Sequence, residues 1–252
     1  MFVINIRTTI DFSINSTPSI LKTYRVQNQY WQQILLKDEI NTQLFWISED
    51  PICKFEFEMQ LRLPLVKSSD PRWIDAVLSD FNSFLQDHAN CERKASAFAM
   101  SLVAKYPDRI DILPELIDTA LEEMEHFKEV YAVMQKRSVL LRHEISEDAY
   151  IKKLLQLLRS SRDERFLDRL LLGSVIENRG AERFRLVYEA VDDTELKKFY
   201  HKLWASEAKH GDIFVKMALK YFPEADVFKR LHELNEKEGE IISSLPFTAA
   251  LH

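Results

Sequence analysis

Two Glu-x-x-His motifs, each preceded by a lone glutamate, limit the folds open to this chain more than any other feature. The lone glutamate lies 31 residues before the first motif and 30 residues before the second, on an earlier stretch of helical periodicity. The two half-sites together comprise Glu92, Glu123, His126, Glu177, Glu207 and His210. Because the spacing nearly repeats, it indicates an internal duplication of a helix pair, over about 71–137 and 163–221.

The phase of each motif on its helix indicates a metal site. Residues at positions i and i+3 share a helix face, so each Glu-x-x-His presents a carboxylate and an imidazole to one point. Di-iron carboxylate bundles use the same ligand set: two helices each supply one glutamate, and the other two each supply a Glu-x-x-His motif. Four carboxylates and two imidazoles favour iron or manganese over copper or zinc. The sequence therefore predicts a four-helix bundle around a di-iron centre.

A single Glu-x-x-His motif would be weak evidence, because glutamate is common and chance matches are expected. The prediction depends on a conjunction: both motifs lie in the middle of an apolar helical stripe, and each has a matching inward glutamate. Burying four carboxylates without cations would be prohibitively costly. Their place on apolar stripes is therefore itself an argument for a metal.

The helical phase also indicates which of several neighbouring glutamates faces the bundle interior. Glu182 lies five residues after Glu177, which places it roughly 140° around the helix, and only Glu177 shares the apolar stripe. In the same way Glu122 and Glu125 are rotated away from Glu123, which is the inward carboxylate of its helix. We therefore expect Glu177, and not Glu182, to bind metal.

The wider pattern predicts an all-α fold. Only 4 Gly and 8 Pro occur in 252 residues, which argues for long helices and few turns. Helical periodicity, capping residues and prolines predict helices over about 71–106, 111–137, 146–160, 163–190, 192–221 and 225–243. The helix at 146–160 is expected to carry the crossover between the two halves. The last helix is an addition to the four-helix set.

Residues 1–59 are the least regular part of the sequence, and we expect an N-terminal extension of uncertain order there. Alternating apolar and acidic residues over 55–59 favour a short strand. The metal-binding domain is expected to cover residues 60–252.

Composition restricts the compartment and the partners. We expect no membrane span, because no run of about 18 apolar residues is present, and the first residues lack the pattern of a secretory signal. Two cysteines do not make a disulfide framework, which favours the cytoplasm. A net charge of −6 argues mildly against bulk nucleic-acid binding. Two ferrous ions would offset the four ligand carboxylates, however, so the charge does not exclude such a partner.

Several longer segments carry a family resemblance. They are Asp70–Trp73 (DPRW), 87–95 (DHANCERKA), 122–127 (EEMEHF), 176–184 (IENRGAERF), 205–210 (ASEAKH), and the pairs Leu245-Pro246 and Leu251-His252. With these motifs the chain, from about residue 60 to His252, resembles the tRNA 2-methylthio-N6-isopentenyladenosine hydroxylases, a ferritin-like family. Residues 1–59 have no counterpart in that resemblance.

The resemblance implies a ferritin-like four-helix bundle with a non-haem centre of two iron ions, held by the six residues of the two half-sites. It implies hydroxylation of the isopentenyl chain on adenosine-37 in the tRNA anticodon loop, with O2 as co-substrate. It also implies an external two-electron donor, supplied by a redox partner protein of the reductase or ferredoxin type.

Three alternatives remain open on the sequence. Another di-iron oxidase or oxygenase acting on an acyl or aldehyde substrate would have a long apolar tunnel. A ferroxidase or other metal-handling protein would take up iron without oxidising an organic substrate. A metal-free helical adaptor would bind no metal at all. His88, one turn before Glu92, is either a partner of that ligand or a satisfied core histidine.

Overall fold

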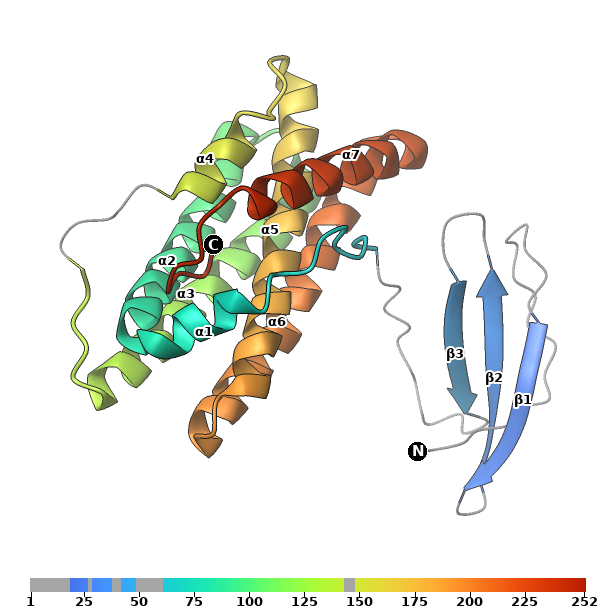
Figure 1. Ribbon diagram of the computed structural model, residues 1–252. Helices are drawn as coiled ribbons and strands as arrows, with labels where there is room; N and C mark the ends of the chain where they lie inside the picture. Colours follow the sequence, from blue (N-terminus) through green and yellow to red (C-terminus); the bar gives the residue numbers. More distant parts are fainter. Residues whose placement is uncertain (1–18, 27–28, 38–41, 49–60, 143–147) are drawn as a thin grey trace. The chain divides into compact units, whose positions relative to one another are not determined.

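The computed structural model describes residues 19–26, 29–37, 42–48, 61–142 and 148–252 of the chain (Figure 1). The chain forms two compact units, residues 1–59 and residues 60–252. Each unit is described by itself below.

The first unit contains a three-stranded antiparallel sheet of order β1-β2-β3. Its strands are β1 (Ser19–Val26), β2 (Gln29–Lys37) and β3 (Thr42–Ser48). The pairing of β1 with β2 shifts its register between Ile20 and Lys22, whereas β2 and β3 pair without a shift. The strand expected over 55–59 lies outside the described residues.

The described part of the second unit contains helices and connecting segments but no strand. Its helices are α1 (Arg72–Ser79), α2 (Phe81–Lys105), a short 3-10 helix (Ile110–Ile112), α3 (Leu113–Lys136), α4 (Ala149–Leu155), α5 (Arg162–Ala190), α6 (Thr194–Leu219) and α7 (Glu224–Ser243). The all-α class predicted for the metal-binding domain is confirmed.

Four long helices form a bundle from two helix hairpins. Helix α2 packs along α3, and α5 packs along α6, as the internal duplication predicts. Helix α7 then crosses the bundle and packs mainly on α5 (Figure 1). Helix α5 is buried on several sides, because it contacts α1, α6 and α7. The centre of the bundle is consequently shielded from water.

The predicted helix over 71–106 is wrong in one respect, because two helices occupy this range. The backbone of Asp80 leaves helical geometry at φ −141° and ψ 64°, and its side chain accepts a hydrogen bond from the Ser83 amide. An aspartate in this role is a favourable helix N-cap. The chain therefore turns between α1 and α2 without a glycine or proline. The helix expected over 146–160 is also shorter than predicted, because α4 spans only Ala149–Leu155.

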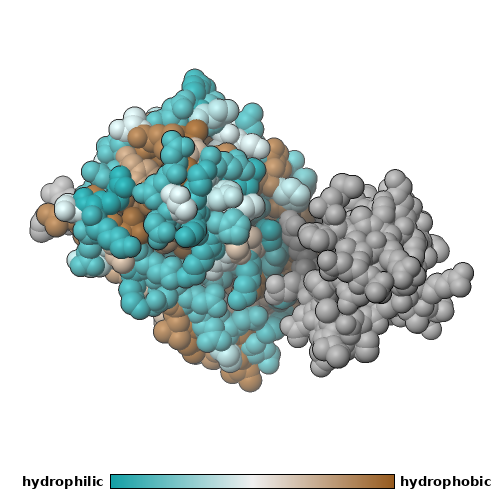
Figure 2. All heavy atoms as spheres, turned by 90° about the horizontal axis from the view of Figure 1, so that it is seen from below, coloured by the Kyte–Doolittle hydropathy of each residue, from teal (hydrophilic) through white to brown (hydrophobic). Residues whose placement is uncertain are grey.

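Apolar packing surrounds the bundle centre at both ends. One core contains Phe166, Leu170 and Phe214, and a second contains Trp73 and Phe84. The face of the helical unit seen in Figure 2 is largely hydrophilic, with separate apolar patches. Among the described helices, none has both the length and the apolar composition needed to cross a bilayer.

Candidate metal centre

All six residues of the two half-sites lie at the centre of the bundle. Glu92 comes from α2, Glu123 and His126 from α3, Glu177 from α5, and Glu207 and His210 from α6. Each is at most 9% exposed. Carboxylates are rarely buried unless they are paired or bind metal, so this concentration requires cations or protons to balance it.

The six side chains form two overlapping groups. Glu92, Glu123, His126 and Glu207 each offer one ligand atom, and these atoms lie within 4.8 Å of one another; the same holds for Glu123, Glu177, Glu207 and His210. Glu123 and Glu207 belong to both groups. Each group could hold one metal ion, with a glutamate and a histidine of its own and two carboxylates that both groups share.

The orientation of the shared carboxylates fits a metal better than hydrogen bonding. The Nδ1 atom of His210 lies 2.8 Å from Glu123 Oε1, and that of His126 lies 3.1 Å from Glu207 Oε1. Both oxygens nevertheless lack an aligned hydrogen-bond donor within the part of the chain that the structure describes. Because a hydrogen bond weakens steeply off-axis, the short distances alone do not satisfy these two oxygens. Lone pairs that converge in this way suit a cation placed between them.

Without a cation, protons must limit the negative charge of the cluster. Burial, together with neighbouring carboxylates, raises the pKa of Glu92 and of Glu177 well above the ordinary value. Burial alone would lower the pKa of each histidine, but Glu123 and Glu207 outweigh it and raise the pKa of His126 to about 9 and that of His210 to about 12. Divalent cations would replace these protons.

Two contacts from outside the cluster hold the side chains of Glu92 and His210 in place. Buried His88 lies with Nε2 2.6 Å from Glu92 Oε1 and Nδ1 3.3 Å from the Tyr200 hydroxyl, which favours its role as a partner of Glu92 over that of an isolated core residue. Between the two helix pairs, Glu122 Oε2 on α3 lies 2.8 Å from Nε2 of His210 on α6. Such contacts fix ring orientation and leave the other nitrogen for a metal.

Helical phase separates the competing glutamates as expected. Glu177 converges with Glu123, Glu207 and His210. Glu182 instead accepts hydrogen bonds from the amide and hydroxyl of Ser69 and from Arg179. Glu122 does not belong to either group, but its carboxylate contacts Nε2 of His210, whereas Glu123 lies at Nδ1 of the same ring. The sequence pattern gave no signal for that contact, because it joins two helices of different halves.

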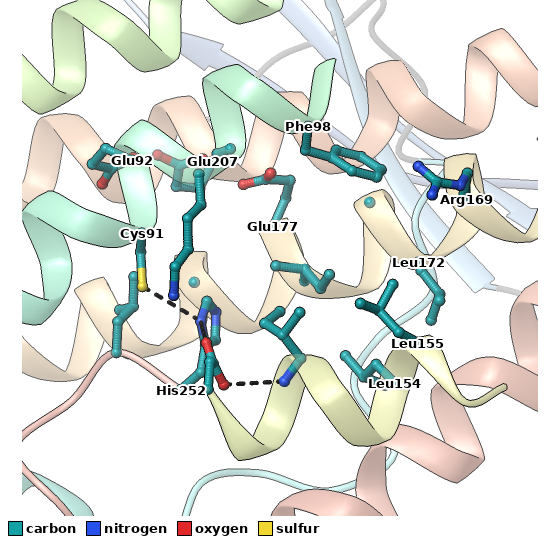
Figure 3. A pocket seen from close by; sticks show the side chains of 18 of the residues that line it. Cys91, Glu92, Phe98, Leu154, Leu155, Arg169, Leu172, Glu177, Glu207 and His252 are labelled. Atoms are coloured by element: carbon teal, nitrogen blue, oxygen red, sulfur yellow. Dashed lines mark hydrogen bonds and ion pairs between the residues drawn. The ribbon is translucent and has the colours of Figure 1, made fainter. Parts of the chain in front are cut away.

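A cavity of about 290 Å³ opens beside the cluster. Its wall includes Glu92, Glu177 and Glu207 at one side and apolar side chains such as Phe98, Leu154 and Leu172 (Figure 3). Its size is near the lower end for small-molecule sites. A ligand in this cavity would lie against the carboxylates in mostly apolar surroundings.

Comparisons with known proteins agree with this geometry. A solved structure, "Protein 43 with aldehyde deformylating oxygenase activity" from Synechococcus, superposes with a TM-score of 0.70 at 28% identity, over 73% of this chain and 92% of that one. The similarity confirms the ferritin-like four-helix bundle.

Two curated relatives share one name, tRNA 2-(methylsulfanyl)-N(6)-isopentenyladenosine(37) hydroxylase. The protein from Pseudomonas putida is 38% identical over 172 residues, which cover 68% of this chain and 83% of the relative. The protein from Salmonella typhimurium is 26% identical over 227 residues, covering 71% and 80%. The family model described as tRNA-(MS[2]IO[6]A)-hydroxylase (MiaE) matches residues 59–252. This chain therefore belongs to the tRNA-(MS[2]IO[6]A)-hydroxylase family.

Proposed function

We propose that this protein is an O2-dependent di-iron monooxygenase that hydroxylates the isopentenyl side chain of (2-methylthio-)N6-isopentenyladenosine at position 37 of tRNA. Family membership supports the substrate, which both curated relatives carry in their names. The observation that carries the proposal is a buried cluster of four carboxylates and two imidazoles beside an apolar cavity.

The six clustered residues are proposed to hold two iron ions. When bound, iron would supply the O2 activation that attack on an unactivated C–H bond requires. One oxygen atom of O2 enters the C–H bond and the other leaves as water, so an external donor must deliver two electrons. We expect a redox partner protein of the reductase or ferredoxin type.

The chain itself binds and orients the substrate. Phe98, Leu172 and Ile176 give the cavity an apolar wall suited to a prenyl chain, and that wall keeps water from the reacting carbon. The modified base has to leave the anticodon-loop stack to place its prenyl chain there, which an unpaired loop permits at low cost. A tRNA substrate also favours the cytoplasm.

The direct test is incubation of the purified, iron-loaded protein with prenylated tRNA, O2 and a reductant. Mass analysis of the digested nucleosides should show one added oxygen atom on the prenyl-adenosine, and label from ¹⁸O2 should appear in it. Unprenylated tRNA is the matched control. A protein that carries two irons per chain and adds no oxygen would refute the proposal.

One observation favours a second candidate, an oxygenase acting on an acyl or aldehyde substrate. The superposed Synechococcus protein is named for aldehyde deformylating oxygenase activity. Adding a fatty aldehyde to the same assay decides between the two. Conversion of the aldehyde with no change in the tRNA would establish the second candidate, whereas oxygen on the nucleoside alone would establish the first.

A further inference from the structure

The segment after α7 returns to the bundle and is fixed there by its backbone. The Trp73 indole donates a hydrogen bond to the Ala250 carbonyl at 3.0 Å, and the Leu251 amide donates one to Asp87 Oδ2 at 2.8 Å. Arg183 donates a further bond to the Leu251 carbonyl. These three contacts come from α1, α2 and α5, so they hold His252 in one place without involving its side chain.

The His252 imidazole lies in the wall of the cavity beside the metal cluster. Its side chain is only 7% exposed, and its ring stacks on Tyr150 with centroids 4.9 Å apart and planes 7° apart. Nδ1 faces Cys91 Sγ at 3.8 Å and Asp148 Oδ2 at 3.9 Å. Among the described residues, none offers Nε2 a hydrogen-bond partner. A buried polar atom without a partner is uncommon in folded proteins and calls for an explanation.

The surroundings of the ring indicate which nitrogen carries the proton. Burial lowers the pKa of His252 to about 4, so the ring is neutral near pH 7, with one N–H and one lone pair. The Asp148 carboxylate on the Nδ1 side favours the N–H at that nitrogen. Nε2 is then an acceptor, and it calls for an N–H or O–H donor.

The arrangement of polar and apolar groups around the cavity fits the proposed substrate. Figure 3 shows His252 on the opposite side of the view from Glu92, Glu177 and Glu207. Apolar residues, including Ile176 and Phe184, line the same cavity. In N6-isopentenyladenosine the N6–H is the donor at the point where the polar base meets the apolar prenyl chain. A prenyl chain directed at the carboxylates would leave this N–H on the His252 side.

We propose that His252 is a substrate-binding residue whose Nε2 accepts a hydrogen bond from N6–H of the prenylated adenine, and that this bond selects N6-prenylated bases. The inference rests on the proposed tRNA hydroxylase function. It adds to the cavity a specificity determinant that is not one of the six proposed metal-binding residues.

The test uses the full chain and two anticodon stem-loop RNAs. One carries N6-isopentenyladenosine, and the other carries the ether analogue in which oxygen replaces N6–H. Wild type should bind the N–H compound about tenfold more tightly than the ether, the effect of one hydrogen bond. Binding is measured by fluorescence anisotropy with iron-free protein, and hydroxylation of both RNAs by the iron-loaded protein supplies kcat/KM.

The variant His252→Phe keeps a ring against Tyr150 and removes Nε2. It should bind the two RNAs equally while retaining the iron content of wild type. His232→Phe is the matched control, because His232 lies exposed on α7 and pairs with Glu236; it should preserve the tenfold preference.

Each outcome separates this inference from the proposed function. If wild type hydroxylates the N–H compound but binds both RNAs equally, the inference is overturned while the function stands, and no variant is needed to see it. A preference that survives in His252→Phe overturns it as well. A zinc ion that copurifies with wild type and is lost from the variant would instead make Cys91, Asp148 and His252 a metal site. Absence of hydroxylation on either RNA refutes the function itself.

Discussion

At the scale of single residues, Glu123 and Glu207 differ from the other proposed ligands because each belongs to both groups in the cluster. Glu123→Ala should therefore leave less than one iron per chain, whereas Glu177→Ala, which alters one group only, should retain about one. Iron analysis of folded protein, with circular dichroism as a check on folding, measures both. Equal loss from the two variants would show that the metals are not arranged around shared carboxylates.

Glu182→Ala is the matched control for Glu177→Ala, because both residues lie on α5 within one and a half turns. Glu182 bonds to Ser69 and Arg179, so its removal should lower thermal stability and leave two irons per chain. If Glu182→Ala empties the site and Glu177→Ala does not, the helical phase used to choose between them is wrong.

Glu122 gives a second prediction at this scale. Its carboxylate lies against Nε2 of His210 from the side away from the shared oxygens, where it fixes the ring. Mutating a residue that orients a metal ligand typically lowers metal affinity or activity about 10- to 100-fold. We expect Glu122→Ala to weaken iron binding within that range. Glu125→Ala is the control, since Glu125 is exposed and pairs with exposed Lys128. An iron titration that gives equal affinities for both variants would contradict the orienting role.

The residues of the cluster could be predicted because they are set by helical phase, which is a local property of the sequence. The period of 3.6 residues fixes which of Glu177 and Glu182 faces inward once the apolar stripe is known. Glu122 and His252 could not be found in this way. Their partners come from other helices, and only the packing of α3 on α6, or the return of the last segment, brings them together.

At the scale of elements, buried Asp168 links three segments. Its carboxylate on α5 accepts hydrogen bonds from Arg159, before that helix, and from Arg230 on α7. Removing one member of a buried ion pair leaves an uncompensated charge and costs about 3 kcal/mol. Asp168→Asn should therefore lower the free energy of unfolding in urea at pH 7 and loosen α7. Asp163→Asn, at an exposed carboxylate of the same helix, should have little effect.

The same carboxylate makes the link sensitive to acid. Burial raises the pKa of Asp168, but hydrogen bonds from Arg230 and Arg159 outweigh burial and hold the pKa below its ordinary value of 3.8. Because the folded pKa lies below the unfolded one, the stabilisation is complete above the unfolded pKa and is lost as pH falls through the folded pKa. The difference in unfolding free energy between wild type and Asp168→Asn should therefore shrink below about pH 4. A difference that stays constant from pH 7 to pH 3 would contradict this assignment.

Element boundaries were predicted well where a proline or a capping residue marks them. The ends of α3, α5 and α7 lie within a few residues of the prediction. The break at Asp80 was missed because residues on both sides continue the helical apolar pattern. Periodicity reports which face is apolar and does not report whether the backbone continues through an aspartate that caps the next helix.

At the scale of the whole molecule, the fold of the helical unit could be predicted and that of residues 19–48 could not. The bundle follows from long periodic segments with a ligand repeat. The segments between the three strands carry no single strong turn signal. Strand formation also depends on pairing partners that lie elsewhere in the sequence. The family model also begins only at residue 59, so neither motif nor resemblance informs the first unit.

The last prediction concerns where the catalytic part begins. Residues 61–67 contact the bundle closely: the Leu61 and Arg62 amides donate to Asp212, and the Lys67 carbonyl accepts from Arg179. A fragment of residues 60–252 keeps these bonds and should hold two irons and hydroxylate prenylated tRNA like the full chain. A fragment of residues 71–252 leaves Asp212 and Arg179 without these hydrogen bonds. Each lost partner lowers the free energy of unfolding by about 1–3 kcal/mol, so this fragment should melt many degrees lower. Thermal melts and the nucleoside assay on both fragments measure this. If the 60–252 fragment keeps its iron but loses activity on tRNA while remaining folded, the first unit contributes directly to tRNA binding.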